Sequence, residues 1–273
     1  SSFEQSSSTA QELMKDFDKL KQKLLNEHIS DWERKQVLDQ MQQKQEQIKQ
    51  QVEQLQQSVQ QKNNLQQKLS DQDEELLKKQ QEIENLLNNL MDNELKKMID
   101  EFNSMKEQFN KDEFLKKSDE MKMSYDDLSK QLDRDLELLK RMDVEEQVTN
   151  LGDRLQDLAD EQQKLSEEMR NGKNSEELQQ QIQNVSKELE SIKKSYNDAL
   201  QKNEELQQKF ELQNFEKQFN DIQQSMQKSQ SEQAQKQQNK SSKSMKDASD
   251  QTQQLGQSMN QMMQQQMSKQ NME

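Results

Sequence analysis

The sequence predicts an all-α protein made of elongated antiparallel coiled-coil hairpins with a more compact helical bundle in the middle. None of its 273 residues is Pro and only three are Gly, so almost nothing interrupts a helix. Hydrophobic residues make up 27% of the chain and charged residues 34%, which leaves too few apolar residues for a wide globular core. The apolar residues recur three and four positions apart, the heptad spacing of a coiled-coil seam, which needs only two positions in seven.

The clearest seams lie on either side of Asn171-Gly172. Each continues for several helical turns, and the polar turn between them contains Gly, so this stretch predicts an antiparallel helical hairpin. The residues of the two seams are Val148, Leu151, Leu155, Leu158, Leu165 and Met169 before the turn, and Leu178, Ile182, Val185, Leu189, Ile192, Tyr196, Ala199, Leu206 and Phe210 after it.

Composition divides the chain into four expected segments. Residues 1–70 hold N-terminal helices that include a Gln-rich coil. Residues 71–143 form a Leu-, Met- and Phe-rich helical segment, and residues 144–226 form the coiled-coil hairpin. Residues 227–273 form a Gln- and Met-rich C-terminal helix or a partly disordered tail, and their first part, up to residue 243, is expected to be a solvated helix at best.

The first segment predicts two helices. The first runs from about Thr9 to Glu27, after a frayed, Ser-rich start. Ser30 and Glu33 have the spacing of a capping box, so a second helix should begin there. Trp32, in the first turn of that helix, is expected to pack over the end of the preceding helix, because large aromatic side chains mostly serve packing.

Polar residues that commonly cap helices predict several breaks in the rest of the chain. Ser70-Asp71, Asn110, Ser124 and Asp143 each precede an apolar run. At Asp92-Asn93 the seam slips by one position, which requires either a break or a local change in helix winding. We expect a break there, because Asp is a favourable N-cap residue.

Two sets of residues are candidates for a specific role. Polar residues that replace apolar ones in a seam cost stability but fix register and orientation, and these are Gln45, Gln80, Gln162 and Asn203. Apolar residues of the middle segment that we expect to be exposed are candidates for binding a partner, and these are Phe102, Phe109, Phe114 and Met121.

The residue types argue against an enzyme. The chain contains no Cys and a single His, His28, so neither a zinc site nor a nucleophile with its base can be assembled. Acid–base catalysis requires a desolvated pocket, whereas carboxylate pairs on a thin coil face water. We therefore expect no catalytic residue, no metal and no cofactor. The net charge of −14 makes nucleic acid and anionic membrane surfaces unfavourable partners.

The segment Met121-Lys-Met-Ser-Tyr-Asp-Asp-Leu128, followed by Leu132-Asp-Arg-Asp-Leu-Glu-Leu-Leu-Lys140, resembles a known family. This family is the uncharacterised, membrane-anchored, Gln-rich coiled-coil proteins of Bacteroidota, whose pattern is similar to M-x-M-S-N-E-D-L and L-D-R-T-L-E-L-F-K. Asp135 and Leu139 depart from that pattern. Asp31-Trp32-Glu33 and the Lys-, Gln-, Ala- and Met-rich C-terminal helix are also similar to the family. The resemblance implies a periplasmic location and an inner-membrane anchor outside this sequence, and it implies no activity.

These expectations define two hypotheses of function. The first is a non-catalytic structural or scaffold coiled-coil module of a cell-envelope protein, which mediates protein–protein interaction or spans distance in the periplasm. Its partners would be protein helices, from another copy or another envelope protein, and it would meet a membrane only through an anchor outside this sequence. The second is a periplasmic holdase-type chaperone with helical arms, because Met-rich surfaces bind varied apolar clients. A cytoplasmic location is the alternative to the periplasm.

Overall fold

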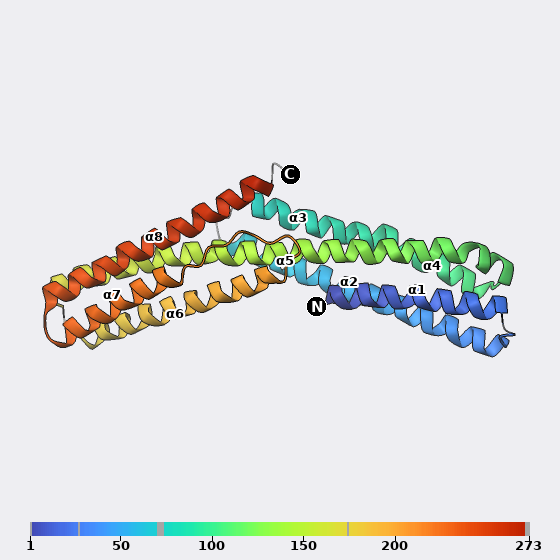
Figure 1. Ribbon diagram of the computed structural model, residues 1–273, viewed down its shortest axis with the longest axis horizontal. Coiled ribbons are helices and arrows are strands. Elements are labelled where there is room, and N and C mark those ends of the chain that lie inside the picture. Colours follow the sequence, from blue (N-terminus) through green and yellow to red (C-terminus); the bar gives the residue numbers. More distant parts are fainter. Residues whose placement is uncertain (1, 27, 70–73, 174, 271–273) are drawn as a thin grey trace. The chain divides into compact units, whose positions relative to one another are not determined.

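The computed structural model describes residues 2–26, 28–69, 74–173 and 175–270, and within these ranges all regular structure is helical (Figure 1). The elements in chain order are α1 (Ser2–Asn26), α2 (Asp31–Leu69), α3 (Glu74–Asn89), the π-helix η1 (Leu90–Leu95), α4 (Lys96–Glu107), α5 (Lys111–Arg170), α6 (Glu176–Glu204), α7 (Glu216–Ala234) and α8 (Gln238–Gln270). Helices joined by short turns form antiparallel hairpins, so the all-α class predicted from the sequence is confirmed.

The chain folds into two compact units, Ser1–Met142 and Asp143–Glu273, where the sequence suggested four segments. α5 contributes residues to both, up to Met142 in the first unit and from Asp143 in the second. The buried stripe of α5 changes phase here, because Met142 is followed by Val144 and Val148 rather than by residues in the same heptad register. The boundary between the units therefore lies where α5 begins to bury a different stripe.

The first unit is an antiparallel bundle of α1, α2, the continuous helical segment α3–η1–α4, and the first part of α5. Such a bundle buries one apolar stripe from each helix. The α4–α5 pair is joined by the short turn after α4, and α5 also packs against α1. Side-chain bonds of 2.6–3.1 Å join neighbouring helices: Lys44 to Asp16, Gln42 to Asn103, and Lys21 to Asp119.

The core of the first unit includes an aromatic cluster around Phe17 of α1. Its ring centroid lies 6.1 Å from that of Phe102 in α4, and 6.2 and 5.5 Å from those of Phe114 and Tyr125 in α5. Gln45 of α2 donates a hydrogen bond from Nε2 to the Tyr125 hydroxyl, so the polar atom of this cluster is paired. Four helices of the bundle thus meet at one layer.

The break expected at Asp92-Asn93 is wrong, because the helix continues through the π-helix from Leu90 to Leu95. These two buried leucines are five positions apart, whereas a heptad allows steps of three or four. A π-turn holds more residues than an α-turn and takes up the extra one, so that both leucines face the core. The structure therefore shows the local change in winding that was the alternative to a break.

Helix starts expected at Ser124 and Asp143 are also wrong, since α5 is a single helix of 60 residues. The Ser124 hydroxyl donates to the carbonyl oxygen of Glu120 one turn earlier, which satisfies the side chain inside the helix. Asp143 accepts a bond of 3.2 Å from Lys202 of α6. Both side chains thus have partners that require no helix terminus.

Two other predicted caps are confirmed. The backbone N–H of Glu33 donates to Ser30 Oγ at 3.2 Å where α2 begins. Asn110 Oδ1 accepts bonds of 3.0 and 3.3 Å from two backbone N–H groups in the first turn of α5. The cap expected at Ser70-Asp71 lies outside the described residues.

The N-terminal region differs from expectation in two respects. α1 begins at Ser2 rather than near Thr9, and the Ser7 hydroxyl is buried 3.0 Å from that of Ser129 in α5. Ser7 therefore belongs to the helix interface and not to a frayed end. Trp32 is 67% exposed, so the expectation that it packs over the preceding helix is wrong.

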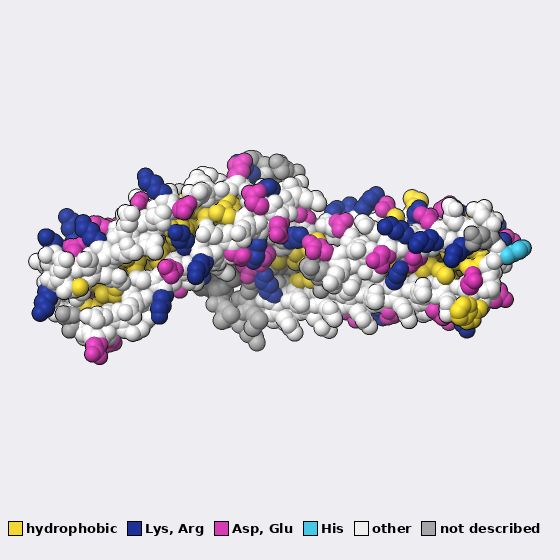
Figure 2. Space-filling view, turned by 60° about the horizontal axis from the view of Figure 1, so that its bottom comes forward, with side chains coloured by type: hydrophobic (Ala, Val, Ile, Leu, Met, Phe, Trp, Pro, Cys, Tyr) yellow, Lys and Arg dark blue, Asp and Glu magenta, His cyan; other side chains and the backbone are white. Residues whose placement is uncertain are grey.

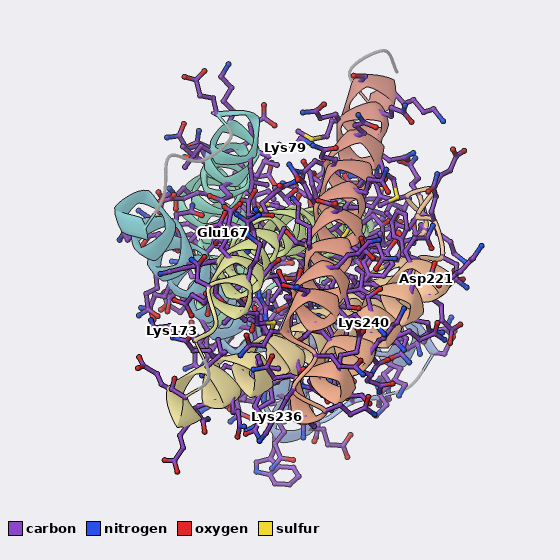
Figure 3. The ribbon with its side chains drawn as sticks, turned by 90° about the vertical axis from the view of Figure 1, so that its left-hand side faces the viewer. Lys79, Glu167, Lys173, Asp221, Lys236 and Lys240 are labelled. Carbon is purple, nitrogen blue, oxygen red and sulfur yellow. The ribbon has the colours of Figure 1, made fainter. Side chains whose placement is uncertain are left out.

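The second unit is an antiparallel bundle of α6, α7, α8 and the second part of α5. The hairpin predicted around Asn171-Gly172 is present, and its first helix ends in a Schellman motif with Gly172 at φ 79°. α7 ends in the same backbone motif with Lys236 at φ 59° in the position usually held by Gly. Figure 3 looks onto this end, with Lys173 beside the first turn and Lys236 beside the second.

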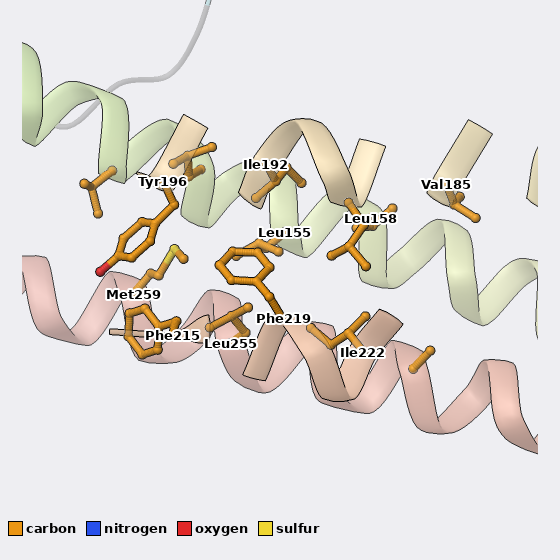
Figure 4. Packing of buried hydrophobic residues seen from close by; sticks show 14 of the residues in the cluster. Leu155, Leu158, Val185, Ile192, Tyr196, Phe215, Phe219, Ile222, Leu255 and Met259 are labelled. Atoms are coloured by element: carbon orange, nitrogen blue, oxygen red, sulfur yellow. The ribbon is translucent and has the colours of Figure 1, made fainter. Parts of the chain in front are cut away.

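Apolar stripes from all four helices meet in the second unit (Figure 4). The ring of Tyr196 in α6 lies 5.5 Å from that of Phe215, which precedes α7, and 6.3 Å from that of Phe219. Its hydroxyl donates to the carbonyl oxygen of Gln213 at 2.5 Å. Other buried residues labelled in Figure 4 are Leu155 and Leu158 of α5, Val185 and Ile192 of α6, Ile222 of α7, and Leu255 and Met259 of α8.

The C-terminal segment forms the long helix α8, which packs closely against α5 through small residues. Ser249 Oγ donates to the carbonyl oxygen of Ala159 at 2.7 Å, and Gly256 lies opposite Gly152. Residues 227–243 were expected to form a solvated helix at best. This expectation is wrong, because Ser229 and Ser241 are fully buried and bond to each other. Small side chains let neighbouring backbones approach, and their hydroxyls pair with carbonyl oxygens.

Candidate interaction site

Three of the four residues predicted to bind a partner lie in the core. Phe102 and Phe114 are 0% exposed and Met121 is 7% exposed, so the expectation that they are exposed is wrong. The two phenylalanines occupy buried stripes of their helices and contact Phe17. Phe109 is half-buried, and the guanidinium group of Arg34 lies 4.3 Å from the centroid of its ring. A cation over an aromatic face is a favourable contact, so Phe109 already has a partner within the chain.

Met121, the fourth predicted residue, borders a groove between α4 and α5 with a volume of about 1020 Å³. One wall comes from residues 94–108, at the end of η1 and along α4 to the following turn. The other wall comes from residues 113–134 of α5. Because the short turn after α4 joins the two walls, they run antiparallel.

The apolar surface of the groove is largely methionine. On α4, Met98 and Met105 lie one heptad apart and are half-buried. On α5, Met121 and Leu128 also border the groove but are 7% and 2% exposed, so they add little accessible surface. Met123 is 67% exposed. Figure 2 shows that on the face it presents, hydrophobic side chains reach the surface in narrow strips among charged and polar ones. Several apolar side chains thus border the α4–α5 groove.

Charged side chains line the rim of the groove, and the unpaired ones are mainly acidic. Lys117 is engaged by Glu113 at 2.9 Å, and Lys130 is engaged by Asp126 at 3.0 Å, both along α5. Five acidic residues of the lining form no ion pair with any described residue, and these are Glu94, Asp100, Glu101, Glu120 and Asp127. Two basic residues of the lining, Lys97 and Arg134, also form none. The groove therefore presents an apolar strip between mainly acidic groups.

A buried carboxyl lies one residue beyond the groove, at Asp135 of α5. Its side chain is 4% exposed, and burial raises its pKa from the ordinary value of 3.8 to about 6. Arg134 opposes this rise in pKa, whereas Glu94 adds to it. Asp135 occupies a heptad position on the core side of α5, so the bundle holds a carboxyl where an apolar residue would normally lie.

The polar seam residues are all buried, as expected for seam positions: Gln45, Gln80, Gln162 and Asn203. Gln162 Nε2 lies 3.2 Å from the sulfur of Met226 in α7, and Asn203 bonds to the backbone of Phe210. Since these contacts join different elements, they are compatible with the register-setting role, which stays a prediction.

Other features of the surface offer less. A second hollow of about 520 Å³ on α7 and α8 is lined entirely by Ser, Asp and Gln side chains. Among the described residues, no group of three His, Cys, Asp or Glu side chains is placed to hold a metal ion. No helix in the described part of the chain combines the length and hydropathy needed to cross a membrane.

The methionines on α4 were visible in the sequence but were misread as core. Leu95, Met98 and Phe102 have the spacing of a seam in the sequence, whereas the structure buries Ile99 and leaves Met98 half-buried. Two adjacent apolar stripes on one helix are wider than a single seam requires. The extra width of the apolar stripe on α4 could have indicated a second apolar surface. Nothing in the sequence indicated that Met123 is exposed.

No family model, curated protein or solved structure matches this chain. The fold and the site define its class: an all-α protein of two antiparallel helical bundles, with an open methionine-lined groove in the first.

Proposed function

We propose that this chain is a non-catalytic scaffold module of a cell-envelope protein and that it binds a protein partner through the groove between α4 and α5. The methionine strip in this groove carries the proposal, because it leaves apolar surface in contact with water on a chain that is 34% charged. Contiguous exposed apolar surface rimmed by polar residues marks interaction sites. Thioether side chains are also flexible and polarisable, which suits a binding surface.

The cell-envelope location rests on the resemblance to the Bacteroidota proteins. Five residues of the segment 121–128 that carries the resemblance line the groove, namely Met121, Met123, Ser124, Asp127 and Leu128. Fractionation of the full-length protein tests the location. A membrane-bound protein whose bundles are digested by protease added to the periplasm supports the proposal, and a bundle protected by the inner membrane favours the cytoplasm.

A photo-reactive amino acid in place of Met123 tests the docking role in cells that make the protein. Met123 is 67% exposed, so its replacement leaves the core intact. We expect one discrete cross-linked product, which disappears when Met98→Glu and Met105→Glu are added. The same photo-reactive amino acid in place of Glu190, exposed on α6, is the control and should give no such product. Equal products at both positions, or a product that survives the double substitution, would contradict a docking role for the groove.

A holdase-type chaperone is the second candidate, because the same methionines are suited to varied apolar clients. This function predicts that the protein suppresses the aggregation of an unrelated unfolded protein at modest molar excess. Met98→Glu with Met105→Glu should then abolish the suppression. Absence of suppression, together with one defined cross-linked partner, rejects the chaperone and leaves the scaffold.

A further inference from the structure

We infer that the partner of the α4–α5 groove is an amphipathic α-helix whose apolar stripe is flanked by Lys or Arg residues. This inference rests on the proposed function and specifies the chemistry of the partner.

The geometry of the walls favours a helix. The α4 wall spans residues 94–108, which at 1.5 Å per residue is about 20 Å, the length of a helix of four turns. Met98 and Met105 on this wall are half-buried and repeat at heptad spacing, and the exposed Met123 lies on the opposite wall. A third helix places its own apolar residues beside such a pair, as in a helix-in-groove complex. An extended peptide has a period of two and does not match this spacing.

The charges of the groove favour a basic partner. Asp100 and Glu101 lie on the α4 wall, and Glu120 and Asp127 on the α5 wall, so acidic groups border the methionines on both sides. None of the four forms an ion pair with a described residue. Lys117 and Lys130 are engaged along α5, which leaves Lys97 and Arg134 as the basic residues of the lining without an ion pair to a described residue, so acidic groups predominate. Basic residues beside the apolar stripe of a partner helix would meet these carboxylates, and acidic ones would be repelled.

The same charges argue against other occupants. A second copy of this chain carries a net charge of −14 and an equally acidic groove, so two such surfaces repel each other. An anionic lipid surface is repelled for the same reason. An unfolded client, as expected for a holdase, needs neither an apolar stripe nor a helical conformation.

Three synthetic peptides test this inference on the full chain. The first is a model helix with Leu at heptad positions and flanking Lys, the second replaces each Lys by Glu, and the third is a scrambled form of the first. Binding is measured by fluorescence anisotropy. Because several exposed charge pairs act together, we expect the Lys-flanked helix to bind about tenfold more tightly than either of the others. Its affinity should fall as salt is added.

Matched variants locate the binding. Asp100→Lys with Asp127→Lys should weaken binding of the Lys-flanked helix by about tenfold, since each change reverses one wall's charge. Met123→Glu, at an exposed position, should weaken it as well. The control, Glu161→Lys with Glu190→Lys, makes the same change in net charge on exposed positions of the second unit and should change affinity by less than about twofold. Circular dichroism checks that every variant keeps its helices.

Several outcomes would overturn the inference. Equal binding of the scrambled peptide would assign the groove to unfolded clients, and equal loss in both Lys double variants would show non-specific attraction to an acidic chain. Self-association that Met98→Glu abolishes would assign the groove to a second copy. A methionine-dependent cross-link without any preference between the Lys and Glu peptides would leave the proposed function standing and reject only the basic helix.

Discussion

The side-chain amide of Asn203 pairs with both backbone polar groups of Phe210. Its Oδ1 accepts from the Phe210 N–H at 2.9 Å, and its Nδ2 donates to the Phe210 carbonyl oxygen at 2.8 Å. α6 ends at Glu204, so Phe210 lies in the connection that follows the helix, and both residues are buried. Asn203 therefore fastens the connection from α6 to α7 through two buried hydrogen bonds to the backbone of Phe210.

Replacing Asn203 by Ala should lower the free energy of unfolding by about 1–3 kcal/mol, because it removes two buried hydrogen bonds. Urea denaturation followed by circular dichroism measures the change. The exposed neighbour Gln201→Ala is the control, with an expected effect within about 0.5 kcal/mol. A loss below about 1 kcal/mol for Asn203→Ala would show that water replaces the amide.

Gly256 should not tolerate a large side chain. A Cβ atom built there lies 3.2 Å from Leu155 Cβ and 3.3 Å from the Gly152 carbonyl oxygen, which are atoms that cannot move aside easily. Gly256→Leu should therefore lower the free energy of unfolding by about 1–3 kcal/mol, despite the better helix propensity of Leu. At Gly152 the nearest obstacle is the Asn260 side chain, which can rotate away. Gly152→Ala should thus be close to neutral in the same urea titration, and a reversed order would contradict the close α5–α8 contact.

The buried carboxyl of Asp135 should make the stability of the first unit depend on pH. Its pKa is about 6 in the folded protein, above the ordinary value of 3.8, so the folded state binds the proton more tightly. The contribution of this group to stability is therefore favourable below about pH 4 and is lost as the pH rises towards 6 and above. Asp135→Asn should raise the free energy of unfolding by about 1–3 kcal/mol at pH 7.5 and leave it almost unchanged at pH 4.

Urea titrations of the Asp135→Asn protein and the unaltered protein at both pH values measure this difference. The comparison between the two proteins at each pH removes the effect of other carboxyls, including Glu4 and Asp119, whose pKa values are lowered by hydrogen bonds from Lys140 and Lys21. Asp133→Asn, on the exposed side of α5, is the control. A gain that is the same at both pH values would reject the buried carboxyl as its cause.

The two Schellman motifs of the second unit predict opposite effects of substitution. Lys236 has φ 59°, a conformation that costs an L-residue free energy, so Lys236→Gly should raise the free energy of unfolding by about 0.5–1 kcal/mol. Gly172 lies at φ 79°, so Gly172→Ala should lower the free energy of unfolding by about 1 kcal/mol. Lys243→Gly, at an exposed position within α8, is the matched control and should lower the free energy of unfolding by about 1 kcal/mol. Thermal unfolding that shows the same sign for both Lys→Gly changes would contradict the left-handed conformation at Lys236.

Heptad spacing was sufficient to predict the all-α class and the hairpin around Gly172, because the position of Leu155 or Leu189 within a seam follows from local sequence alone. It was not sufficient for helix boundaries. Ser124 and Asp143 are favourable caps, but their side chains are equally satisfied within α5. A residue acts as an N-cap only when the chain before it is not helical, and the chain is helical before both Ser124 and Asp143.

The packing of α8 and the groove depended on tertiary contacts that the sequence does not display. Ser241 and Ser249 look like solvated positions, yet their hydroxyls pair with carbonyl oxygens of neighbouring helices. The groove exists because Ile99 and not Met98 points into the core of the first unit. A shift of one residue in the buried stripe of α4 therefore left Met98, and not Ile99, partly exposed to a partner.

Hydrogen exchange of the full chain, alone and with the Lys-flanked model helix, tests the docking role of the α4–α5 groove most directly. We predict slower exchange of backbone amides in residues 94–108 and 113–134, because a bound helix opposes local opening of both walls. Exchange in residues 175–270 should not change. Uniform slowing along the chain, or slowing confined to the second unit, would contradict the assignment of the groove as the binding surface.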